Sequence, residues 1–434
     1  MTSKHENEQI IALLKREVIP AIGCTEPIAV ALCVSKAAET LGKRPEKISV
    51  HLSANILKNA MGVGIPGTGG MIGLPITVAL GTLIGKSEYG LEVLKDCTPE
   101  AVEEGKKIID SKIINISLKS GIEEKLYIEV IMTAGEDNAK AIISGNHTHF
   151  VYVSHNDEVL IDEQHNGNQS ANEEHAVELS LHKIYDFATS VPVEDVKFIL
   201  ESGRMNKRAA EHSFKGEYGH SLGRTLRETS CQGLVMGDST FAHIISYTSA
   251  ACDARMAGEM VPIMSTAGSG NLGISASVPV MIYAEDKKKS EEELTRALVM
   301  SQLIAIYMKQ NIGRLSAVCG CVVAAAGSSS ALTYLMGGEY RQIVYATQNM
   351  IANLTGVICD GAKPSCAMKL TSGIATAILS AVLAMQNRCV TAVEGIIEED
   401  VELSIRNLTK IGTDGMNVTD KMVLDMMTHK HHTK

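Results

Sequence analysis

The sequence predicts an α+β protein, with an N-terminal α/β domain that contains an antiparallel sheet and an all-helical domain after it. Two observations support this fold class. Alternating apolar and polar residues, which are typical of strands, are confined to residues 47–153. Beyond residue 174 the apolar residues recur with helical spacing, and Gly, Ala and Ser occur throughout. We therefore predict two domains, residues 1–172 and residues 173–434.

Composition narrows the class of protein. The 434 residues suffice for two or three domains, and 45% of them are hydrophobic, which supports sizeable cores. The net charge of −10 argues against nucleic acid or an anionic membrane as the main partner. The N-terminus does not resemble a signal peptide, and the apolar stretches are interrupted or too short to span a bilayer. We expect a cytoplasmic protein with no membrane partner, whose ten cysteines are thiols rather than disulfides.

The first forty residues predict a helix, a break and a second helix. Pro20 and Gly23 interrupt the pattern, and Pro27 suits the first turn of the helix that follows. Cys24 and Thr25 therefore lie at a helix N-terminus, where main-chain N–H groups can hold an anion such as a carboxylate. The alternative is an ordinary capped helix start.

The segments between residues 47 and 174 predict strands and one glycine-rich loop. Residues 47–52 alternate like a strand, and residues 113–118, 125–132, 139–144 and 148–153 predict an antiparallel meander. The loop at residues 62–70 lacks the nucleotide-binding glycine signatures, so its glycines indicate backbone that approaches a ligand or another backbone. Residues 157–174 are polar and predict a linker.

The second half predicts helices with small residues at their contacts. The expected segments are 177–189, 193–205, 209–218, 222–236, 241–256, 270–283, 290–308, 314–336, 339–354, 368–387 and 394–409. A polar, glycine-rich turn precedes one of them. Ser269 and Asn271 of this turn could hold the carboxylate or ammonium group of an amino acid, and a plain turn with a cap is the alternative.

Four cysteines lie at two breaks in the helical domain: Cys319, Cys321, Cys359 and Cys366. Their spacing matches neither a zinc ribbon nor a ferredoxin. Three thiolates from separate loops could hold an iron–sulfur cluster with one iron open, and buried core thiols are the alternative. Lys363 also permits a Schiff-base interpretation, but the sequence contains no recognisable phosphate cup for pyridoxal phosphate.

Four motifs occur in one order along the chain: Ile22–Ala29, Ala267–Asn271, Cys319-Gly320-Cys321 and Cys359–Lys363. Together they resemble the L-cysteine desulfidase family, which is related to the iron–sulfur L-serine dehydratases. The resemblance spans nearly the whole chain. The helical half resembles the dehydratase alpha domain. The front half resembles the beta domain, where a serine-rich loop takes the place of residues 23–26.

The resemblance implies a lyase that holds a 4Fe-4S cluster and needs no pyridoxal phosphate. It implies β-elimination from a small L-amino acid, giving pyruvate, ammonia and, from L-cysteine, hydrogen sulfide. Cys319, Cys359 and Cys366 match the dehydratase cluster ligands, and Cys321 is ambiguous. Cys24 matches a desulfidase cysteine that could be a general base or a fourth ligand.

The expected substrate-binding residues are Thr25, Glu26, Ser269 and Asn271. Because the serine-rich loop is absent, L-cysteine is the expected substrate and L-serine the alternative. A zinc or redox protein using the same thiols, or an amino-acid-binding protein without catalysis, are the rival classes. Helices with small-residue faces are also compatible with a homodimer.

Overall fold

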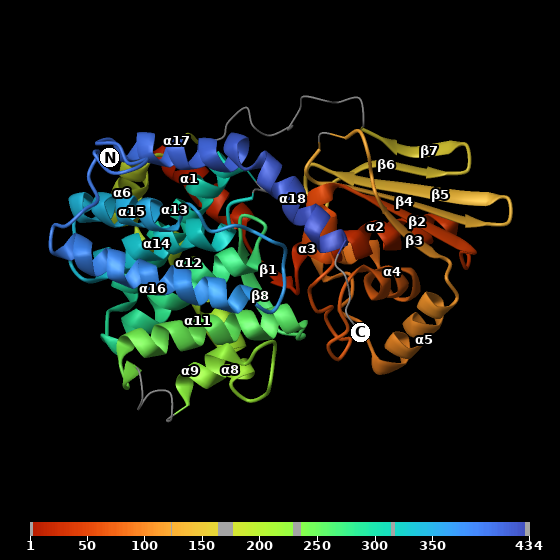
Figure 1. Cartoon of the computed structure of the whole chain (residues 1–434), viewed down its shortest axis with the longest axis horizontal. Coiled ribbons are helices and arrows are strands. Elements are labelled where there is room, and N and C mark those ends of the chain that lie inside the picture. The colour runs from red at the N-terminus through yellow and green to blue at the C-terminus, as the bar shows by residue number, and fades with distance from the viewer. Residues whose placement is uncertain (1–2, 123, 164–176, 229–235, 314–316, 430–434) are drawn as a thin grey trace.

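The computed structural model describes residues 3–122, 124–163, 177–228, 236–313 and 317–429. Figure 1 shows a sheet part and a helical part next to each other, with the C-terminal helix between them. The predicted α+β fold class is confirmed, with sheet and helices in the order expected. The domain boundary at residue 172 stays a prediction.

A six-stranded sheet forms the centre of the sheet part, in the order β3-β2-β4-β5-β6-β7. Its strands are β2 (Lys47–Leu52), β3 (Ile114–Leu118), β4 (Tyr127–Ala134), β5 (Asp137–Ser144), β6 (Phe150–His155) and β7 (Glu158–Asp162). β2 runs parallel to β3 and antiparallel to β4, and the later pairs are antiparallel. The predicted meander is therefore wrong at its first strand. The long segment between β2 and β3 supplies the crossover that a parallel pair requires.

Helices cover one face of this sheet. Ile128, Val130 and Met132 of β4 alternate along the strand and are fully buried. α2 (Thr25–Leu41) packs on β4 and β5, and α4 (Leu74–Leu83) packs on α2. The Cys33 thiol of α2 donates to the Ala141 carbonyl oxygen of β5 at 3.4 Å. α3 (Ala54–Ala60) and α5 (Pro99–Asp110) complete this part.

The helical part is arranged around α14 (Gly320–Leu335), which contacts α12, α13, α15 and α16. The other helices are α6 (Leu181–Ser190), α7 (Val193–Val196), α8 (Leu200–Ser213), α9 (Leu222–Arg227), α11 (Thr240–Ala257), α12 (Gly270–Asp286), α13 (Glu291–Ile312), α15 (Tyr340–Leu354), α16 (Cys366–Met385), α17 (Val401–Lys410) and α18 (Asn417–Thr428). A Cβ at Gly327 of α14 would lie 2.4 Å from the Ser301 carbonyl oxygen, so small residues permit this close packing. Ser329 of α14 donates to the Ala377 carbonyl oxygen at 2.9 Å.

The N-terminal segment belongs structurally with the helices rather than with the sheet. Ile10, Leu13 and Leu14 of α1 (Lys4–Glu17) are buried in the core of the helical part. β1 (Val18–Ile22) pairs with β8 (Pro262–Thr266) in an antiparallel ladder. This pairing brings the start of α2 to the start of α12, and both carry predicted site residues.

Other differences from the prediction are local. The first residues of the expected linker form β7, and the expected helix at 209–218 is the end of α8. β1, β8 and α18 were not predicted, and residues 229–235 of the expected helix at 222–236 lie outside the described residues. By length and composition α16 could cross a membrane, and 50% of its apolar window is buried inside the fold.

Candidate active site

Main-chain hydrogen bonds hold Cys319 and Cys359 next to each other. The Cys319 N–H donates to the Val357 carbonyl oxygen at 2.9 Å, and the Cys359 N–H donates to the Ala317 carbonyl oxygen at 2.7 Å. An antiparallel bridge between the two loops lies within this pair of bonds. Cys319 is also the N-cap residue of α14. The backbone therefore fixes the relation between these two thiols, which are forty residues apart in the sequence.

Cys366 is the first residue of α16, and its loop is stabilised by lysines. The Cys366 thiol lies 3.7 Å from the Gly361 carbonyl oxygen. Lys363 donates to the carbonyl oxygens of Asp360 at 2.9 Å and Gly361 at 3.1 Å, and Lys369 forms an ion pair with Asp360. The Lys363 ammonium is thus occupied within the loop and does not line the pocket, which argues against its use in a Schiff base.

The start of α2 places Glu26 among three hydrogen-bonding groups. The Cys24 thiol donates to Glu26 Oε2 at 3.1 Å, and the Thr25 hydroxyl lies at 3.1 Å from the same oxygen. Asn59 donates to Glu26 Oε1 at 3.2 Å. The Thr25 hydroxyl also lies 3.0 Å from the Gly268 carbonyl oxygen, so this hydroxyl links α2 to the turn before α12. Glu26 is therefore a rigidly held carboxylate.

The start of α12 supplies a cap and an amide. The Ser269 hydroxyl accepts from the Leu272 N–H at 3.5 Å, as an N-cap residue does. Arg255 of α11 donates to Asn271 Oδ1 at 3.0 Å, and the Cys252 thiol lies 3.6 Å from the same oxygen. The Asn271 carbonyl is thus engaged by its neighbours, and this orients the amide beside the pocket.

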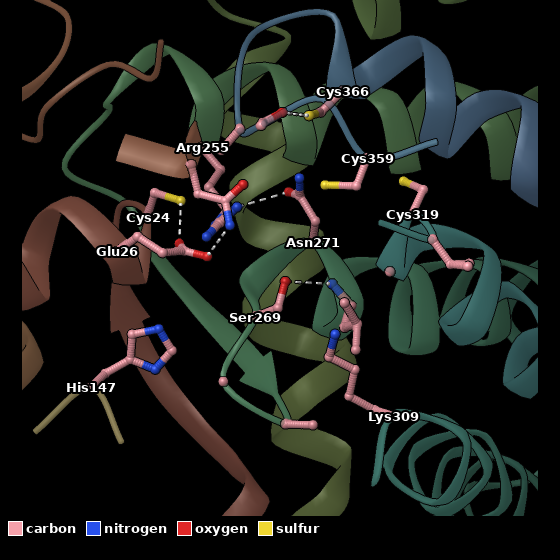
Figure 2. A pocket seen from close by; sticks show the side chains of 18 residues that line it. Cys24, Glu26, His147, Arg255, Ser269, Asn271, Lys309, Cys319, Cys359 and Cys366 are labelled. Carbon is pink, nitrogen blue, oxygen red and sulfur yellow. Dashed lines mark hydrogen bonds between the residues drawn. The ribbon is translucent and has the colours of Figure 1, made fainter. Parts of the chain in front are cut away.

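These elements surround one pocket (Figure 2). Its lining residues are Cys24, Glu26, Asn59, His147, Arg255, Ala267, Gly268, Ser269, Asn271, Leu272, Lys309, Val318, Cys319, Gly320, Cys359, Gly361, Ala362 and Cys366. The volume of about 100 Å³ leaves room for several water-sized groups, since one water needs about 10–15 Å³. Of the predicted site residues, only Thr25 does not line it. The roles of all eight remain predictions.

Four polar residues of the pocket were not predicted: Asn59, His147, Arg255 and Lys309. They come from α3, the loop between β5 and β6, α11 and α13, so no local motif contains them. The one available signal was a charged residue within an apolar helical run, which describes both Arg255 and Lys309. Such residues are rarely buried without a partner.

Glu26 is the carboxylate of the pocket, and its neighbours control its pKa. Burial raises the pKa of Glu26, but the charge of His147, the Cys24 hydrogen bond and Arg255 outweigh burial and lower it overall. The pKa of Cys24 is raised by burial and then by the Glu26 charge. The proton of this pair therefore resides on the thiol, although a helix N-terminus by itself lowers the pKa of a thiol. Removing the thiol from water outweighs the helix dipole.

Burial also controls the pKa values of the cysteines in the helical part. Burial raises the pKa of Cys359, and nearby Cys319 adds to the rise. Burial also raises the pKa of Cys366. Burial lowers the pKa of Lys309, whose charge is in turn favoured by Cys359, Glu26 and Cys319. A cation at Lys309 and negative charge on the thiols therefore stabilise one another.

The donor set of the pocket fits an iron–sulfur cluster. Among the described residues no group of three His, Cys, Asp or Glu side chains converges on one point, as a single metal ion would require. A 4Fe-4S cluster binds each thiolate at a different iron, so its ligands line a cavity instead. Cys319, Cys359 and Cys366 line the same pocket and are free thiols. These three residues would hold the cluster.

The remaining cysteines either do not line the pocket or have side chains outside the described part of the structure. Cys321 is the second residue of α14, and its side chain is outside the described part of the structure. Cys33 and Cys252 are buried, Cys97 and Cys389 are half-buried, and Cys231 lies outside the described residues.

Known proteins resemble the chain over most of its length. Residues 88–425 match the family described as serine dehydratase alpha chain. The chain is 68% identical over 428 residues to a UPF0597 protein of Bacteroides fragilis (strain ATCC 25285), with 99% of each chain covered. It is 52% identical to a UPF0597 protein of Porphyromonas gingivalis (strain W83), with 98% of each covered. Identity to a UPF0597 protein of Clostridium perfringens (strain ATCC 13124) is 42%, again with 98% of each covered.

The family match begins at residue 88, within the sheet part, and so extends beyond the residues 173–434 whose resemblance to the alpha domain was predicted. It includes both cysteine loops and the start of α12. The chain therefore belongs to the serine dehydratase alpha chain family, which is related to the iron–sulfur serine dehydratases, as the order of its motifs predicts.

Proposed function

We propose that this protein is an iron–sulfur lyase that catalyses β-elimination of L-cysteine to pyruvate, ammonia and hydrogen sulfide without pyridoxal phosphate. Membership of the serine dehydratase alpha chain family supports a dehydratase-like lyase. The observation that carries the proposal is that three thiols predicted to bind a cluster line the same pocket as the Cys24–Glu26 pair. These thiols belong to Cys319, Cys359 and Cys366. A cluster with one iron free of protein thiolate supplies a Lewis acid for the leaving sulfur or oxygen.

The Cys24–Glu26 pair is suited to move a proton. Glu26 is ionised and hydrogen-bonded to the protonated thiol at 3.1 Å. In this state Glu26 can accept a proton and Cys24 can donate one. Cys24 can act as the general base for the Cα proton only after its own proton passes to Glu26. A role for Cys24 as fourth ligand would equally require loss of that proton.

The remaining residues suit a small zwitterion. His147 and Arg255 act electrostatically to lower the pKa of Glu26, and Ser269 and Asn271 add neutral polar groups at the helix start. The pocket volume of about 100 Å³ suits a small amino acid. We infer that Glu26 and the polar groups orient the amino acid, while the buried thiols exclude water from the reacting carbon.

L-Serine is the second candidate substrate. The family name of the matching model favours it, because that name is serine dehydratase. The residues at the start of α2 favour L-cysteine, since Cys24 and Glu26 stand where the resemblance predicts a serine-rich loop in dehydratases. The reaction has the same form for both substrates, and only the leaving group differs.

Anaerobic purification, a visible absorption spectrum and assays for pyruvate and sulfide test the proposal. Wild-type protein should show the broad absorption of an iron–sulfur cluster and release both products from L-cysteine. Cys359→Ala should lose absorption and activity, whereas Cys389→Ala, which removes a half-buried thiol outside the pocket, should keep both. Pyruvate from L-serine without sulfide from L-cysteine would change the substrate. A colourless protein that cannot be reconstituted with iron and sulfide would refute the proposal, and bound zinc would then favour the rival class.

A further inference from the structure

Lys309 is a buried lysine that faces the pocket. It lies in the last turn of α13, between the buried residues Met308 and Ile312, and only 8% of its surface is exposed. Its ammonium forms no hydrogen bond or ion pair with any residue that the structure describes, although it lines the pocket. Figure 2 shows the side chain extending from α13 toward Ser269, with the cysteine loops beyond. A buried ammonium without a partner is costly, so the position calls for an anion.

Two other cationic residues of the pocket, His147 and Arg255, act on the Glu26 carboxylate within the protein. Glu26 is the carboxylate of the pocket, and the charges of His147 and Arg255 compensate it. Arg255 in addition donates to Asn271. Lys309 differs from Arg255 in that its ammonium has no hydrogen bond or ion pair with the residues that the structure describes, so its charge can meet a ligand. A zwitterionic amino acid carries one anionic group that can meet it, the α-carboxylate.

We propose that Lys309 binds the α-carboxylate of the amino-acid substrate and thereby restricts this pocket to substrates with a free carboxylate. The inference deepens the proposed function and rests on it, because it assumes that the pocket takes an amino acid. The anion-binding role was expected of the helix starts at Cys24 and Ser269. The side chains at these two starts are engaged within the protein: the Cys24 thiol with Glu26, and the Ser269 hydroxyl with the Leu272 N–H.

The rival role for Lys309 is compensation of negative charge on the cluster thiolates. Cys359 and Cys319 do favour its charged form. The two roles predict different losses. A carboxylate-binding lysine determines which ligands bind, whereas a cluster-compensating lysine determines how much iron the protein retains.

The test compares L-alanine with L-alaninamide by equilibrium dialysis against the reconstituted, oxygen-free protein. L-Alanine has no β leaving group, so it binds without reacting, and the amide differs from it only in lacking the carboxylate. Wild-type protein should bind L-alanine roughly 10- to 100-fold more tightly than the amide, the range for a hydrogen bond to a charged group. Lys309→Met and Lys309→Gln should lose this preference, and Lys309→Arg should keep part of it. Lys107→Met, which removes an exposed charge on α5, should behave as wild type.

Each contrary outcome has a clear meaning. Equal binding of the two ligands by wild type, or a preference that persists in both Lys309→Met and Lys309→Gln, would overturn the inference. Iron content in Lys309→Met as low as in Cys359→Ala would assign Lys309 to the cluster and would also overturn it. If L-cysteine yields no products but the preference for L-alanine depends on Lys309, the lyase proposal fails and the carboxylate site stands. If products form while the preference is independent of Lys309, only this inference fails.

Discussion

Lys58 and Asp420 form an ion pair that joins the sheet part to the C-terminal helix beside the cysteine loop. Only 2% of the Lys58 side chain is exposed, against 21% for Asp420. The Lys58 ammonium also lies 3.5 Å from the Cys359 carbonyl oxygen. α18 contacts α3 at this point, and α3 also carries Asn59, which donates to Glu26. One buried lysine thus connects the C-terminal helix, the sheet part and a predicted cluster ligand.

Asp420→Asn should destabilise the protein by about 2 kcal/mol, because it leaves the buried Lys58 ammonium without its counter-charge. The measurement is the midpoint of thermal unfolding. Asp425→Asn is the matched control on the same helix, since Asp425 is 75% exposed and pairs with the exposed His429. Equal midpoints for the two variants would show that the Lys58 pair contributes nothing measurable. Asp420→Asn should also lose iron faster in air than wild type, because Lys58 contacts the loop of Cys359.

Gly64→Ala should weaken the contact between the sheet part and the helical part at the glycine-rich loop. A Cβ at Gly64 would lie 2.3 Å from the main chain of Ala257, and the Gly64 N–H donates to the Met256 carbonyl oxygen at 3.0 Å. The clash should cost about 1–3 kcal/mol of stability and displace the end of α11 that carries Arg255. Gly415→Ala is the control, since no atom lies within 4 Å of the added Cβ. Unfolding midpoints that coincide for both variants would contradict this role.

The sequence predicted the elements better than their pairing. The fold class, most helices and the strands after β3 follow from periodicity, because burial of one face imposes it. The place of β2 between β3 and β4 could not be predicted, since local alternation does not reveal which strand pairs with which. The role of the glycine loop was left between two alternatives. At Gly64 the glycine-rich loop faces another backbone, that of Ala257, rather than the pocket.

The residues of the candidate site were likewise predicted only in part. Motif residues such as Cys24, Glu26, Cys319 and Cys359 were predicted and do line one pocket. Lys309 was missed because it stands alone in a helix, and only the fold brings it to the pocket. The raised thiol pKa values could not be predicted either, because a helix start is visible in the sequence whereas burial is a property of the whole fold.

Asp253 should make stability depend on pH. Its side chain is fully buried, and burial raises its pKa to about 6 from the ordinary 3.8 although it accepts from the Gly223 N–H. Folding therefore favours the protonated form. Its contribution is complete below the unfolded pKa and is lost as the pH rises toward 6. Wild-type stability should fall by roughly 2 kcal/mol over this range relative to Asp253→Asn, which keeps an acceptor for Gly223.

The measurement is the unfolding midpoint of wild type and Asp253→Asn at several pH values from about 4 to 7. The difference in midpoint, variant minus wild type, should increase with pH and level off above the folded pKa. Asp110→Asn, at the exposed end of α5, should show a constant difference. A constant difference for Asp253→Asn as well would mean that the Asp253 carboxyl titrates normally.

Glu26→Gln should make Cys24 more reactive at a given pH. The Cys24 pKa is raised by burial and then by the Glu26 charge, and the substitution removes the second cause only. The pKa should therefore fall relative to wild type, so that the thiolate fraction rises at every pH below it. The measurement is the rate of iodoacetamide alkylation of Cys24 against pH in cluster-free protein, followed by peptide mass spectrometry. Cys33 is the internal control, because it is equally buried but lies under the sheet away from Glu26. An unchanged or slower alkylation of Cys24 would contradict the proton arrangement on which the proposed acid–base role of this pair depends.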